Sequence, residues 1–297
     1  AANRLFNSNI SLILPVRNID KAVGFFGSPN EISYIQWSLG ENLIFPQPVD
    51  YVIHAACGTS SKSFTLEPAT TISQIVNGGE ETLKAAVDAK AQRYLFLSTM
   101  EVYGEVDGLA TEDNLGKLDP MVVRNTYPEA KRLVECLVAS YAVQHGLSSS
   151  VLRLAQTFGQ GVVKEDMRVF ADFGRHAISG DDIVLLSDGL KRNGYLAIDD
   201  AVSAILTVLL KGKTGEAYNA VNQNTYCSIK EMAEMVLAHF GTKDASLRRE
   251  FDPEREATFR KSSDLKLDTS KLQALGWAPS ESLLDMYQMM IDGWDME

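Results

Sequence analysis

Short apolar runs alternate with longer amphipathic stretches over the first half of the chain. Apolar runs of four to eight residues indicate buried strands, and apolar residues three and four apart indicate helices. Strands alternating with helices predict parallel βαβ units with right-handed crossovers, and hence a doubly wound α/β fold. The expected strands are Ile10–Val16, Ile32–Trp37, Tyr51–Ala55, Tyr94–Leu97 and Ser150–Leu154, and the expected helices are Pro68–Ala89 and Pro128–His145.

The pattern changes after residue 157, where loops at Phe158–Val162 and Ser187–Gly194 interrupt short strands. We therefore divide the chain into a doubly wound region, residues 1–157, and a smaller mixed α/β region, residues 158–297, some of whose segments return to the first. Ligands of open α/β sheets bind at the carboxyl ends of the strands, so the second region should cover that edge and bind substrate. Its expected helices are Asp199–Leu210, Ser228–Phe240 and Leu283–Trp294.

The beginning of the chain differs from a complete dinucleotide-binding fold. Such folds open with a strand and a glycine-rich turn, whose backbone approaches a pyrophosphate at a helix N-terminus. No GxGxxG or GxxGxxG segment occurs, and Ala1–Ser8 resembles the end of a helix that leads directly into a second-strand pattern. We expect a first βα unit upstream of Ala1, because a parallel sheet without its central strand would leave two edges unpaired.

Composition narrows the class of partner. The 297 residues carry 28 basic and 39 acidic side chains, a net charge of −11, which argues against wrapping nucleic acid. The run Ile10–Val16 is too short to span a bilayer, and no secretory leader is recognisable. The three cysteines form no CxxC pair and the four histidines show no metal-type spacing. We expect a cytoplasmic protein with reduced thiols, no metal site, and neither a nucleic-acid nor a membrane partner.

Candidate chemistry follows the strand that ends near Leu97. The segment Ser98–Gly104 (STMEVYG) places two hydroxyls and the Glu101 carboxylate at a carboxyl strand end, where the ligand crevice of such sheets lies. Tyr127 and Lys131 are four residues apart in a first helical turn and share a face. An ammonium beside a phenol lowers the phenol pKa from about 10, which makes tyrosine a usable acid or base near neutral pH.

Two further segments agree with a cofactor site, although each also has a plain structural reading. The strand Asp50–Ala56 (DYVIHAA) ends in small residues, against which a flat cofactor could lie, or it is simply a buried strand. The glycine pair after Asn77 lies within a helical pattern, where it costs helix stability. That cost indicates close packing against a neighbouring element, or else a loose helix start.

Five motifs stand in a fixed order: DYVIHAA, Asn77-Gly78-Gly79, STMEVYG, YPEAK from Tyr127, and RLAQTFGQG from Arg153. This ordered set resembles the extended short-chain dehydrogenase/reductase superfamily. Within it the chain is most similar to the NAD-dependent nucleotide-sugar epimerase, dehydratase and decarboxylase branch. The likeness runs from about Ile10 to the C-terminus and includes the segments around Arg192, Tyr218 and Trp277.

The resemblance implies a Rossmann-like fold, a bound NAD and a nucleotide-diphosphate sugar that is transiently oxidised at C4. Tyr127 would take the hydroxyl proton, Lys131 would hold the nicotinamide ribose, and Thr99 would hydrogen-bond the reacting oxygen. A homodimer is expected. The implied catalytic residues are Thr99, Glu101, Tyr127 and Lys131; the implied cofactor-binding residues are Arg17, Asn18, Ala55, Ala56, Asn77, Ser98, Tyr127, Lys131 and Leu154; the implied substrate-binding residues are Thr99, Gln156, Arg192 and Arg260.

Departures from the family pattern leave alternatives open. Arg17 stands where NAD-preferring relatives often carry an acid, so NADP is the alternative cofactor. Glu101 matches a base of dehydratases and decarboxylases, whereas Met100 replaces the aspartate that assists loss of water. This favours a decarboxylase, or a dehydratase with another acid, and leaves a 4-epimerase open. Because the glycine loop is missing, a non-catalytic cofactor-binding or sensing protein is one alternative. Because of Arg17, an NADPH-dependent carbonyl reductase is another.

Overall fold

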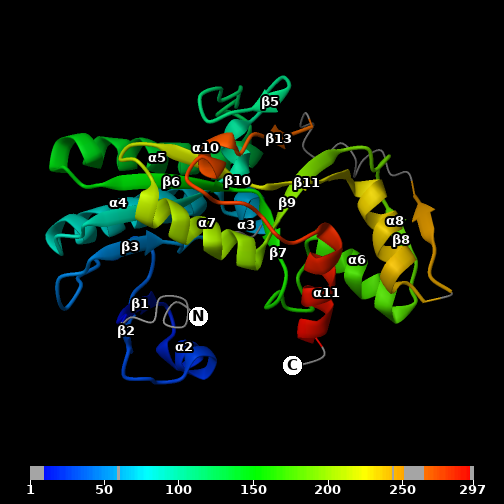
Figure 1. The fold of residues 1–297 in the computed structure, drawn as a ribbon, viewed down its shortest axis with the longest axis horizontal. Coiled ribbons are helices and arrows are strands. Elements are labelled where there is room, and N and C mark those ends of the chain that lie inside the picture. The colour runs from blue at the N-terminus through cyan, green and yellow to red at the C-terminus, as the bar shows by residue number, and fades with distance from the viewer. Residues whose placement is uncertain (1–9, 59–60, 243, 251–263, 295–297) are drawn as a thin grey trace.

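A computed structural model describes residues 10–58, 61–242, 244–250 and 264–294. The expected helix end at Ala1–Ser8 and the candidate Arg260 lie outside these residues. In the described part, strands and helices alternate through the first half and a mixed α/β region follows (Figure 1). The predicted α/β fold is therefore confirmed.

The central sheet consists of four parallel strands with hydrophobic layers on both faces. On one face α4 (Pro68–Asp88) and α5 (Thr126–His145) pack side by side, and on the other lies α7 (Ile198–Lys211) (Figure 1). Each face has its own buried cluster, so the sheet is doubly wound. Its strands, in spatial order, are β10 (Ala217–Ala220), β6 (Ser149–Leu154), β4 (Arg93–Thr99) and β3 (Tyr51–His54).

The helices α4 and α5 approach closely because glycine stands at their contact. A Cβ atom added to Gly79 would lie 2.6 Å from a methyl carbon of Val134 on α5. Gly78 faces Leu39 in the same way, and both glycines are buried within an unbroken helix. The close-packing interpretation of the glycine pair is confirmed, and the cost of two helical glycines is offset by this contact.

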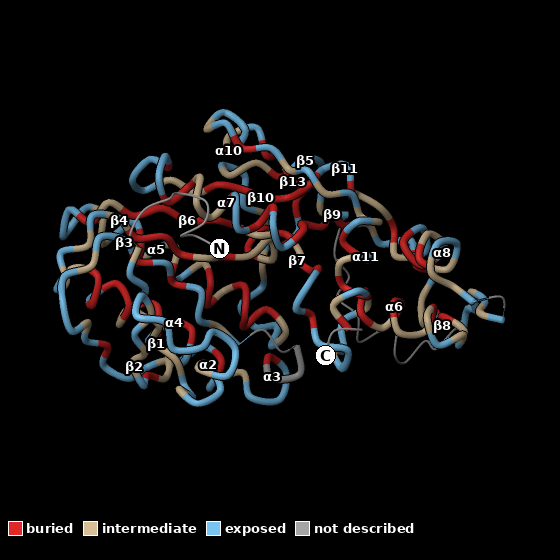
Figure 2. Tube along the Cα trace, turned by 60° about the horizontal axis from the view of Figure 1, so that its bottom comes forward, coloured by how far each residue is buried: buried red, intermediate tan, exposed pale blue. Residues whose placement is uncertain are grey.

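The first strands form a unit of their own. Strand β1 (Leu12–Val16) pairs in parallel with β2 (Ile32–Gln36), and α2 (Ile19–Phe26) connects them below β3 in Figure 1. Among the described residues β1 pairs only with β2, and β3 only with β4. Most of this unit is exposed or intermediate, whereas the central strands are buried (Figure 2). The first βα unit expected upstream of Ala1 stays a prediction.

The second region packs around aromatic side chains. Phe158 stacks on Phe170 at 4.3 Å between ring centroids, and Tyr287 meets Phe158 edge-on. Its main sheet has the order β11 (Asn222–Ser228), β9 (Arg192–Ala197) and β7 (Gln156–Phe158). The remaining elements are β8 (Ile183–Leu185), β12 (Leu247–Arg249), α6 (Val169–Ser179), α8 (Ile229–Phe240) and α11 (Leu283–Trp294).

One predicted loop is wrong at its end. The segment Ser187–Gly194 was expected to be irregular throughout, but β9 begins at Arg192 because Arg192 and Asn193 pair with Ser228 and Cys227 of β11. Gly194 fits within the strand because its missing side chain leaves room for Val221.

Several later segments return to the first region. Strand β10 completes the central sheet, and β13 (Lys266–Leu267) pairs with β5 (Leu109–Ala110) above it (Figure 1). The next element after β13 is α10 (Ser270–Gln273), which packs against β10. Short helices η1 (Met100–Tyr103), η2 (Val123–Asn125) and α3 (Ser61–Leu66) surround the end of β4. The division of the chain at residue 157 stays a prediction. Strands β10 and β13 come after that residue but pair with strands of the first region.

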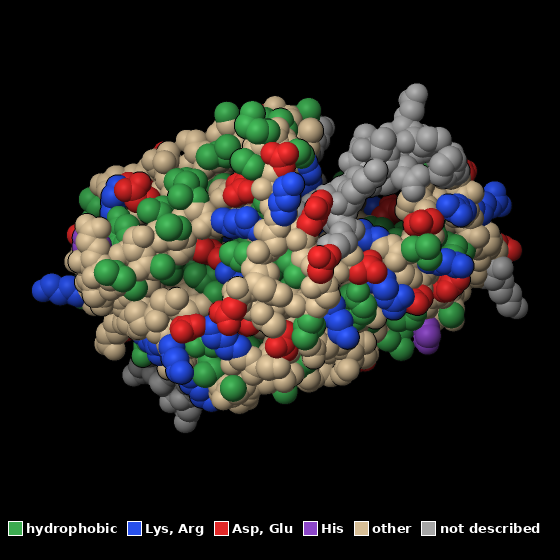
Figure 3. Space-filling model, turned by 90° about the horizontal axis from the view of Figure 1, so that it is seen from above, with side chains coloured by type: hydrophobic (Ala, Val, Ile, Leu, Met, Phe, Trp, Pro, Cys, Tyr) green, Lys and Arg blue, Asp and Glu red, His purple; other side chains and the backbone are tan. Residues whose placement is uncertain are grey.

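The surface seen in Figure 3 shows no large patch of one charge on its coloured part. Seen from above, acidic and basic side chains are interspersed over the coloured part of the surface (Figure 3). Within the described ranges no helix has the length and apolar character needed to cross a bilayer. No cluster of three or more histidine, cysteine or acidic side chains suited to a metal ion occurs among those residues either.

Candidate active site

The candidate site is centred on the carboxyl end of β4. Thr99 is the last residue of that strand and the N-cap of η1, and its hydroxyl accepts a hydrogen bond of 3.2 Å from the amide of Glu101. The cap turns the chain sharply, so that the side chains of Thr99 and Glu101, two of the predicted catalytic residues, both lie at the end of the strand. Leu154 pairs with Thr99 in the sheet, and Gln156 begins β7 two residues later.

Tyr127 and Lys131 lie beside this strand end on the first turns of α5. Their side chains are buried, with 7% and 4% of their surfaces exposed, and the Lys131 nitrogen lies 5.9 Å from the centre of the Tyr127 ring. The Thr99 hydroxyl lies within hydrogen-bonding reach of the Tyr127 phenol, and Lys131 donates to the carbonyl of Leu97 at 2.9 Å. The structure therefore places Thr99, Tyr127 and Lys131, three of the four predicted catalytic residues, close together at the end of β4.

The ionisation of this pair differs from the sequence expectation. Burial raises the pKa of the Tyr127 phenol, an effect that the negative charge of Glu101 reinforces and the Thr99 hydrogen bond and Arg124 oppose. Burial also lowers the pKa of Lys131. The expected lowering of the tyrosine pKa is thus outweighed, because the phenol is almost enclosed and the Lys131 ammonium is directed at a backbone carbonyl.

Glu101 has a partner that the sequence did not reveal. The guanidinium of Arg124 on η2 meets both of its carboxylate oxygens, with nitrogen–oxygen distances of 3.0 and 3.3 Å. Arg124 also lies over the ring of Phe64, at 5.5 Å from its centroid, and Phe64 stacks on Tyr127 at 4.4 Å. Arg124 stands three residues before Tyr127, but nothing in its spacing alone indicated that it would reach η1.

Ser98 is placed differently from Thr99. Its side chain points to α5, where the hydroxyl donates to Glu135 at 2.6 Å. Glu135 in turn accepts two or more hydrogen bonds from the buried Arg153 of β6, whose guanidinium also donates to the hydroxyl of Tyr103 at 2.9 Å. This buried network ties the end of β4, η1 and α5 together, and it holds the Ser98 hydroxyl in a structural contact.

Four of the predicted cofactor residues line a hollow between the β1–β2 unit and β3. A pocket of about 590 Å³ is lined by Arg17, Asn18, Ala55 and Ala56, together with Lys21, Cys57 and Gln74. Asn18 also caps α2 by accepting the amide of Lys21 at 2.8 Å. Asn77 is not among the lining residues, since its amide donates to Ser73 on the same helix. Lys21 and Cys57 were missed by the sequence reasoning.

Cys57 connects this pocket with the catalytic pair. Its thiol lies within hydrogen-bonding reach of Lys131, and burial raises the thiol pKa while the ammonium opposes that effect. The pocket at Ala55–Cys57 and the Tyr127–Lys131 pair are therefore continuous through one side-chain contact. Small side chains at this strand end leave the backbone accessible, as a cofactor that lies flat against it requires.

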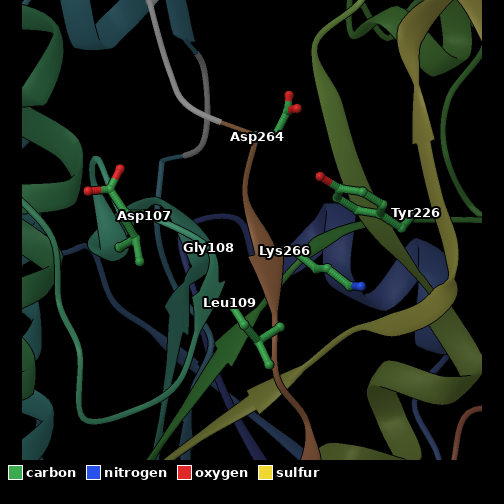
Figure 4. Close-up of a pocket in the computed structure, with 7 residues that line it drawn as sticks. Asp107, Gly108, Leu109, Tyr226, Asp264 and Lys266 are labelled. Atoms are coloured by element: carbon green, nitrogen blue, oxygen red, sulfur yellow. The ribbon is translucent and has the colours of Figure 1, made fainter.

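Arg192 lies at the start of β9, away from the buried pair. Its guanidinium meets both carboxylate oxygens of Glu231 at 3.0 and 2.8 Å and lies 5.3 Å from the ring centre of Tyr226. Tyr226 borders a pocket of about 520 Å³ whose other lining residues include Asp107, Asp264 and Lys266 (Figure 4). Figure 4 shows these side chains around an open space above β5 and β13. Arg260, the second predicted arginine, is outside the described residues.

The fold and the Thr99–Tyr127–Lys131 cluster define a protein of the short-chain dehydrogenase/reductase class. Residues 30–222 match the model of the NAD dependent epimerase/dehydratase family, and the chain belongs to this family. The predicted superfamily and nicotinamide cofactor are thereby confirmed at the level of the family.

Similar proteins come from several kingdoms. The chain is 32% identical over 222 residues to the low-salt glycan biosynthesis protein Agl12 of Haloferax volcanii, which covers 74% of this chain and 67% of that protein. It is 29% identical to UDP-glucuronic acid decarboxylase 6 of Arabidopsis thaliana, over 82% of this chain and 68% of the relative. A dTDP-glucose 4,6-dehydratase from Streptomyces venezuelae, solved with NAD bound, has a similar fold with a TM-score of 0.79, 20% identity, and coverage of 98% and 89%.

Proposed function

We propose that this chain converts a nucleotide-diphosphate sugar through a transient ketone at C4 of the sugar. The observation that carries the proposal is the convergence of the Thr99 hydroxyl, the Tyr127 phenol and the Lys131 ammonium at the carboxyl end of β4. A hydroxyl, a phenol and a cation in contact form the proton-transfer part of a dehydrogenase site. Relatives named as a nucleotide-sugar decarboxylase and a nucleotide-sugar dehydratase support the substrate class.

The residues around the 590 Å³ pocket fit a nicotinamide dinucleotide. Ala55 and Ala56 would hold it against β3, Arg17 and Asn18 would contact its ribose end, and Lys131 would contact the ribose near Tyr127. When bound, the nicotinamide supplies the hydride acceptor and later the hydride donor. Arg17 and Lys21 place two cations at this pocket, which would suit a 2′-phosphate, so NADP is the alternative to NAD in this chain.

Each catalytic side chain has one task in this scheme. Tyr127 takes the proton of the C4 hydroxyl, and Thr99 orients the same oxygen by a hydrogen bond. The raised pKa of Tyr127 and the lowered pKa of Lys131 both come from burial, so proton transfer needs the ammonium to turn from Leu97 toward the phenol. Such a rearrangement on ligand binding is a common way in which enzyme hydrogen bonds tighten.

Among the possible later steps, decarboxylation agrees best with the residues after Thr99. A C4 ketone allows the C5–C6 bond to break: carbon dioxide leaves, its bonding electron pair becomes the enolate of the ketone, and a proton then adds at C5. Met100 cannot donate the proton that loss of water from C6 would need. Glu101 is present in either case, so a dehydratase with another acid and a 4-epimerase are the remaining outcomes of the test.

The nucleotide part is assigned to Arg192 and the pocket beside it. Arginine suits a diphosphate because its planar guanidinium forms bidentate hydrogen bonds. Tyr226 borders the 520 Å³ pocket (Figure 4), and the Arg192 guanidinium lies 5.3 Å from the centre of its ring, so an aromatic face and a cation are available together beside the pocket. Gln156 lies at the start of β7, next to β9, and is assigned to the sugar.

A homodimer is proposed through the outer face of α5. Leu133 and Val143 are 48% and 90% exposed on this helix, and Cys136 is exposed between them. An apolar stripe on a helix normally packs against another element. Light scattering should give twice the chain mass, and an oxidant should crosslink Cys136 pairs; a monomer at about 10 μM would reject the dimer. The cytoplasm, where these thiols stay reduced, is the proposed location.

The test of function is product analysis. The protein is incubated with NAD or NADP and with UDP-glucuronate, UDP-glucose or dTDP-glucose, and the products are identified by mass spectrometry. The expected result is conversion of UDP-glucuronate to a UDP-pentose. Binding of the cofactor without conversion of any nucleotide sugar would support a sensing protein instead. Reduction of simple carbonyl compounds by NADPH would support a carbonyl reductase.

A further inference from the structure

An ion pair between Glu101 and Arg124 lies at the carboxyl end of β4, next to the residues proposed to hold the reacting atoms. Glu101 and Arg124 face each other through two nitrogen–oxygen contacts of 3.0 and 3.3 Å. Their side chains are 25% and 31% exposed, so the pair is reachable from the surface, unlike Lys131. Both charges act on the Tyr127 phenol, with Glu101 raising its pKa and Arg124 lowering it.

Arg124 is held in place by more than its ion pair. Its guanidinium covers the face of Phe64, whose ring stacks on Tyr127 at an interplanar angle of 12°. The next residue, Asn125, anchors the segment by donating its side-chain amide to the carbonyl of Asp119 at 2.9 Å. The position of the guanidinium relative to the phenol is therefore fixed by stacking and by backbone anchoring, with Glu101 as one of its contacts.

In the proposed reaction, the sugar carbon next to the reacting carbon would lie beside this pair. If the C4 hydroxyl lies at Tyr127 and Thr99, then C5 and its C6 substituent extend along the chain beyond Thr99, where Glu101 stands. A carboxylate at C6 would meet the negative charge of Glu101, and two like charges at such distances repel strongly in a partly buried site. Arg124 supplies the charge that would offset this repulsion.

We infer that Arg124 is a specificity-determining residue that binds a carboxylate at C6 of the sugar, so that the preferred substrate is a nucleotide-linked uronic acid. The inference rests on the proposed function. A guanidinium has five N–H donors, and Glu101 occupies one edge of it in the substrate-free protein. The substrate carboxylate becomes the second acceptor, and Arg124 then stands between two negative charges. A neutral hexose gains nothing from this arrangement.

Arg124 contributes to substrate binding, whereas the C4 ketone makes cleavage of the C5–C6 bond possible. A cation that holds the C6 carboxylate gains no strength as the negative charge moves to the enolate oxygen, so this contact lowers KM without raising kcat. Removing Arg124 should accordingly raise KM for the uronic acid much more than it changes kcat. A residue that only supports the fold would show no such dependence on the substituent at C6.

The test compares the affinities of two nucleotide sugars that differ only at C6. Calorimetry is done with UDP-glucuronate and UDP-glucose in a Tyr127→Phe background, which prevents turnover. The expected result for Arg124→Met is UDP-glucuronate binding that is about 10- to 100-fold weaker, as for loss of a charge-assisted hydrogen bond, with UDP-glucose affected less than about threefold. Arg124→Lys, which keeps the charge and loses the fork, should give an intermediate value.

A control is Arg248→Met on β12, which removes an arginine–carboxylate pair with Asp182; this strand pairs with β8, on the opposite side of the molecule from β4 (Figure 2). It should leave both affinities unchanged. Equal weakening of both sugars by Arg124→Met, with an unchanged melting temperature, would overturn the inference. If the parent protein binds UDP-glucose as tightly as UDP-glucuronate, the inference also fails while the proposed function stands. If it binds neither sugar nor UDP, the proposed function itself fails.

Discussion

Tyr127 and Arg192 are assigned to two ends of one substrate, yet their surroundings differ. Tyr127 is 7% exposed and is held by Thr99, Phe64 and the neighbouring strand. The Arg192 side chain is 33% exposed, and its charged contact is with Glu231 on the surface of α8. Groups in the first environment have little freedom and strong mutual influence, whereas groups in the second are solvated and screened. The catalytic end should therefore respond to substitution far more steeply than the nucleotide end.

The largest effect is expected at the phenol. Tyr127→Phe removes the proposed acid–base oxygen while the ring stays against Phe64, so turnover should fall about 10²–10⁴-fold and the melting temperature should change little. Steady-state kinetics with the best substrate and a thermal melt measure the two quantities. Near-normal turnover by this variant would remove Tyr127 from the mechanism and erase the contrast between the two ends.

The buried network below the catalytic end should carry a comparable free energy of folding. Arg153→Met leaves the Glu135 carboxylate buried without its bidentate partner, which typically costs about 3–5 kcal/mol. Urea unfolding measures this free energy. Arg248→Met on the surface, where the arginine is 65% exposed, is the control and should change little. A cost below about 1 kcal/mol for Arg153→Met would mean that water reaches the network.

The same contrast explains what could be foreseen from the sequence. The hydrophobic pattern predicted β3, β4 and β6 of the central sheet and the helices α4, α5 and α7 to within a few residues, because buried strands and long amphipathic helices have strong patterns. The fourth strand of that sheet, β10, was not predicted. The family resemblance implied that Thr99 and Tyr127 act on the same oxygen, and the structure brings their side chains together at the end of β4. The helices α2 and α6 were not predicted.

The missing parts depend on long-range contacts. The pairing of Glu101 with Arg124 joins residues 23 apart through two short 3₁₀ helices, which have no periodic signal. Ser98 was expected at the cofactor, but whether its hydroxyl faces the cofactor or Glu135 depends on the strand face and on Arg153. Similarly, the pKa of Tyr127 is raised because the side chain is buried, and the four-residue spacing between Tyr127 and Lys131 gives no information about burial.

A pH effect should separate the two ends further. His54 on β3 is 5% exposed and stacks on Phe96, and burial, with Lys131 nearby, lowers its pKa to about 3. Its folded pKa lies below the unfolded value of about 6.5, so the unfolded state binds more protons between these values and stability falls as the pH drops below 6.5. At pH 5 this should cost about 2 kcal/mol relative to pH 7.

The measurement is urea unfolding of the parent protein and of His54→Leu at pH 7 and pH 5. The variant should lose the part of the acid destabilisation that His54 contributes. The exposed His239 serves as the control, and His239→Gln should keep the full pH dependence. Identical slopes for the parent protein and His54→Leu would show that the buried end contains no such titrating group.

The smallest effects are expected at Arg192. Arg192→Ala should weaken binding of UDP by roughly three- to tenfold, because an exposed charge contributes less than a buried one and salt screens it.

Glu231→Gln sharpens this expectation because it should act in the opposite direction. Glu231 pairs with Arg192 and also closes the capping box of α8 with Ser228. Glutamine preserves the capping box and removes the negative charge that competes with a phosphate. UDP should then bind a few-fold more tightly, with unchanged helix content. The gain should disappear in the Arg192→Ala background and should shrink at about 0.5 M salt, where the Debye length is about 4 Å, roughly half its value at 0.15 M. Calorimetry with the four proteins forms a double-mutant cycle. If Glu231→Gln leaves UDP affinity unchanged while Arg192 is present, the guanidinium does not reach the nucleotide, and the nucleotide end of the site must be sought elsewhere.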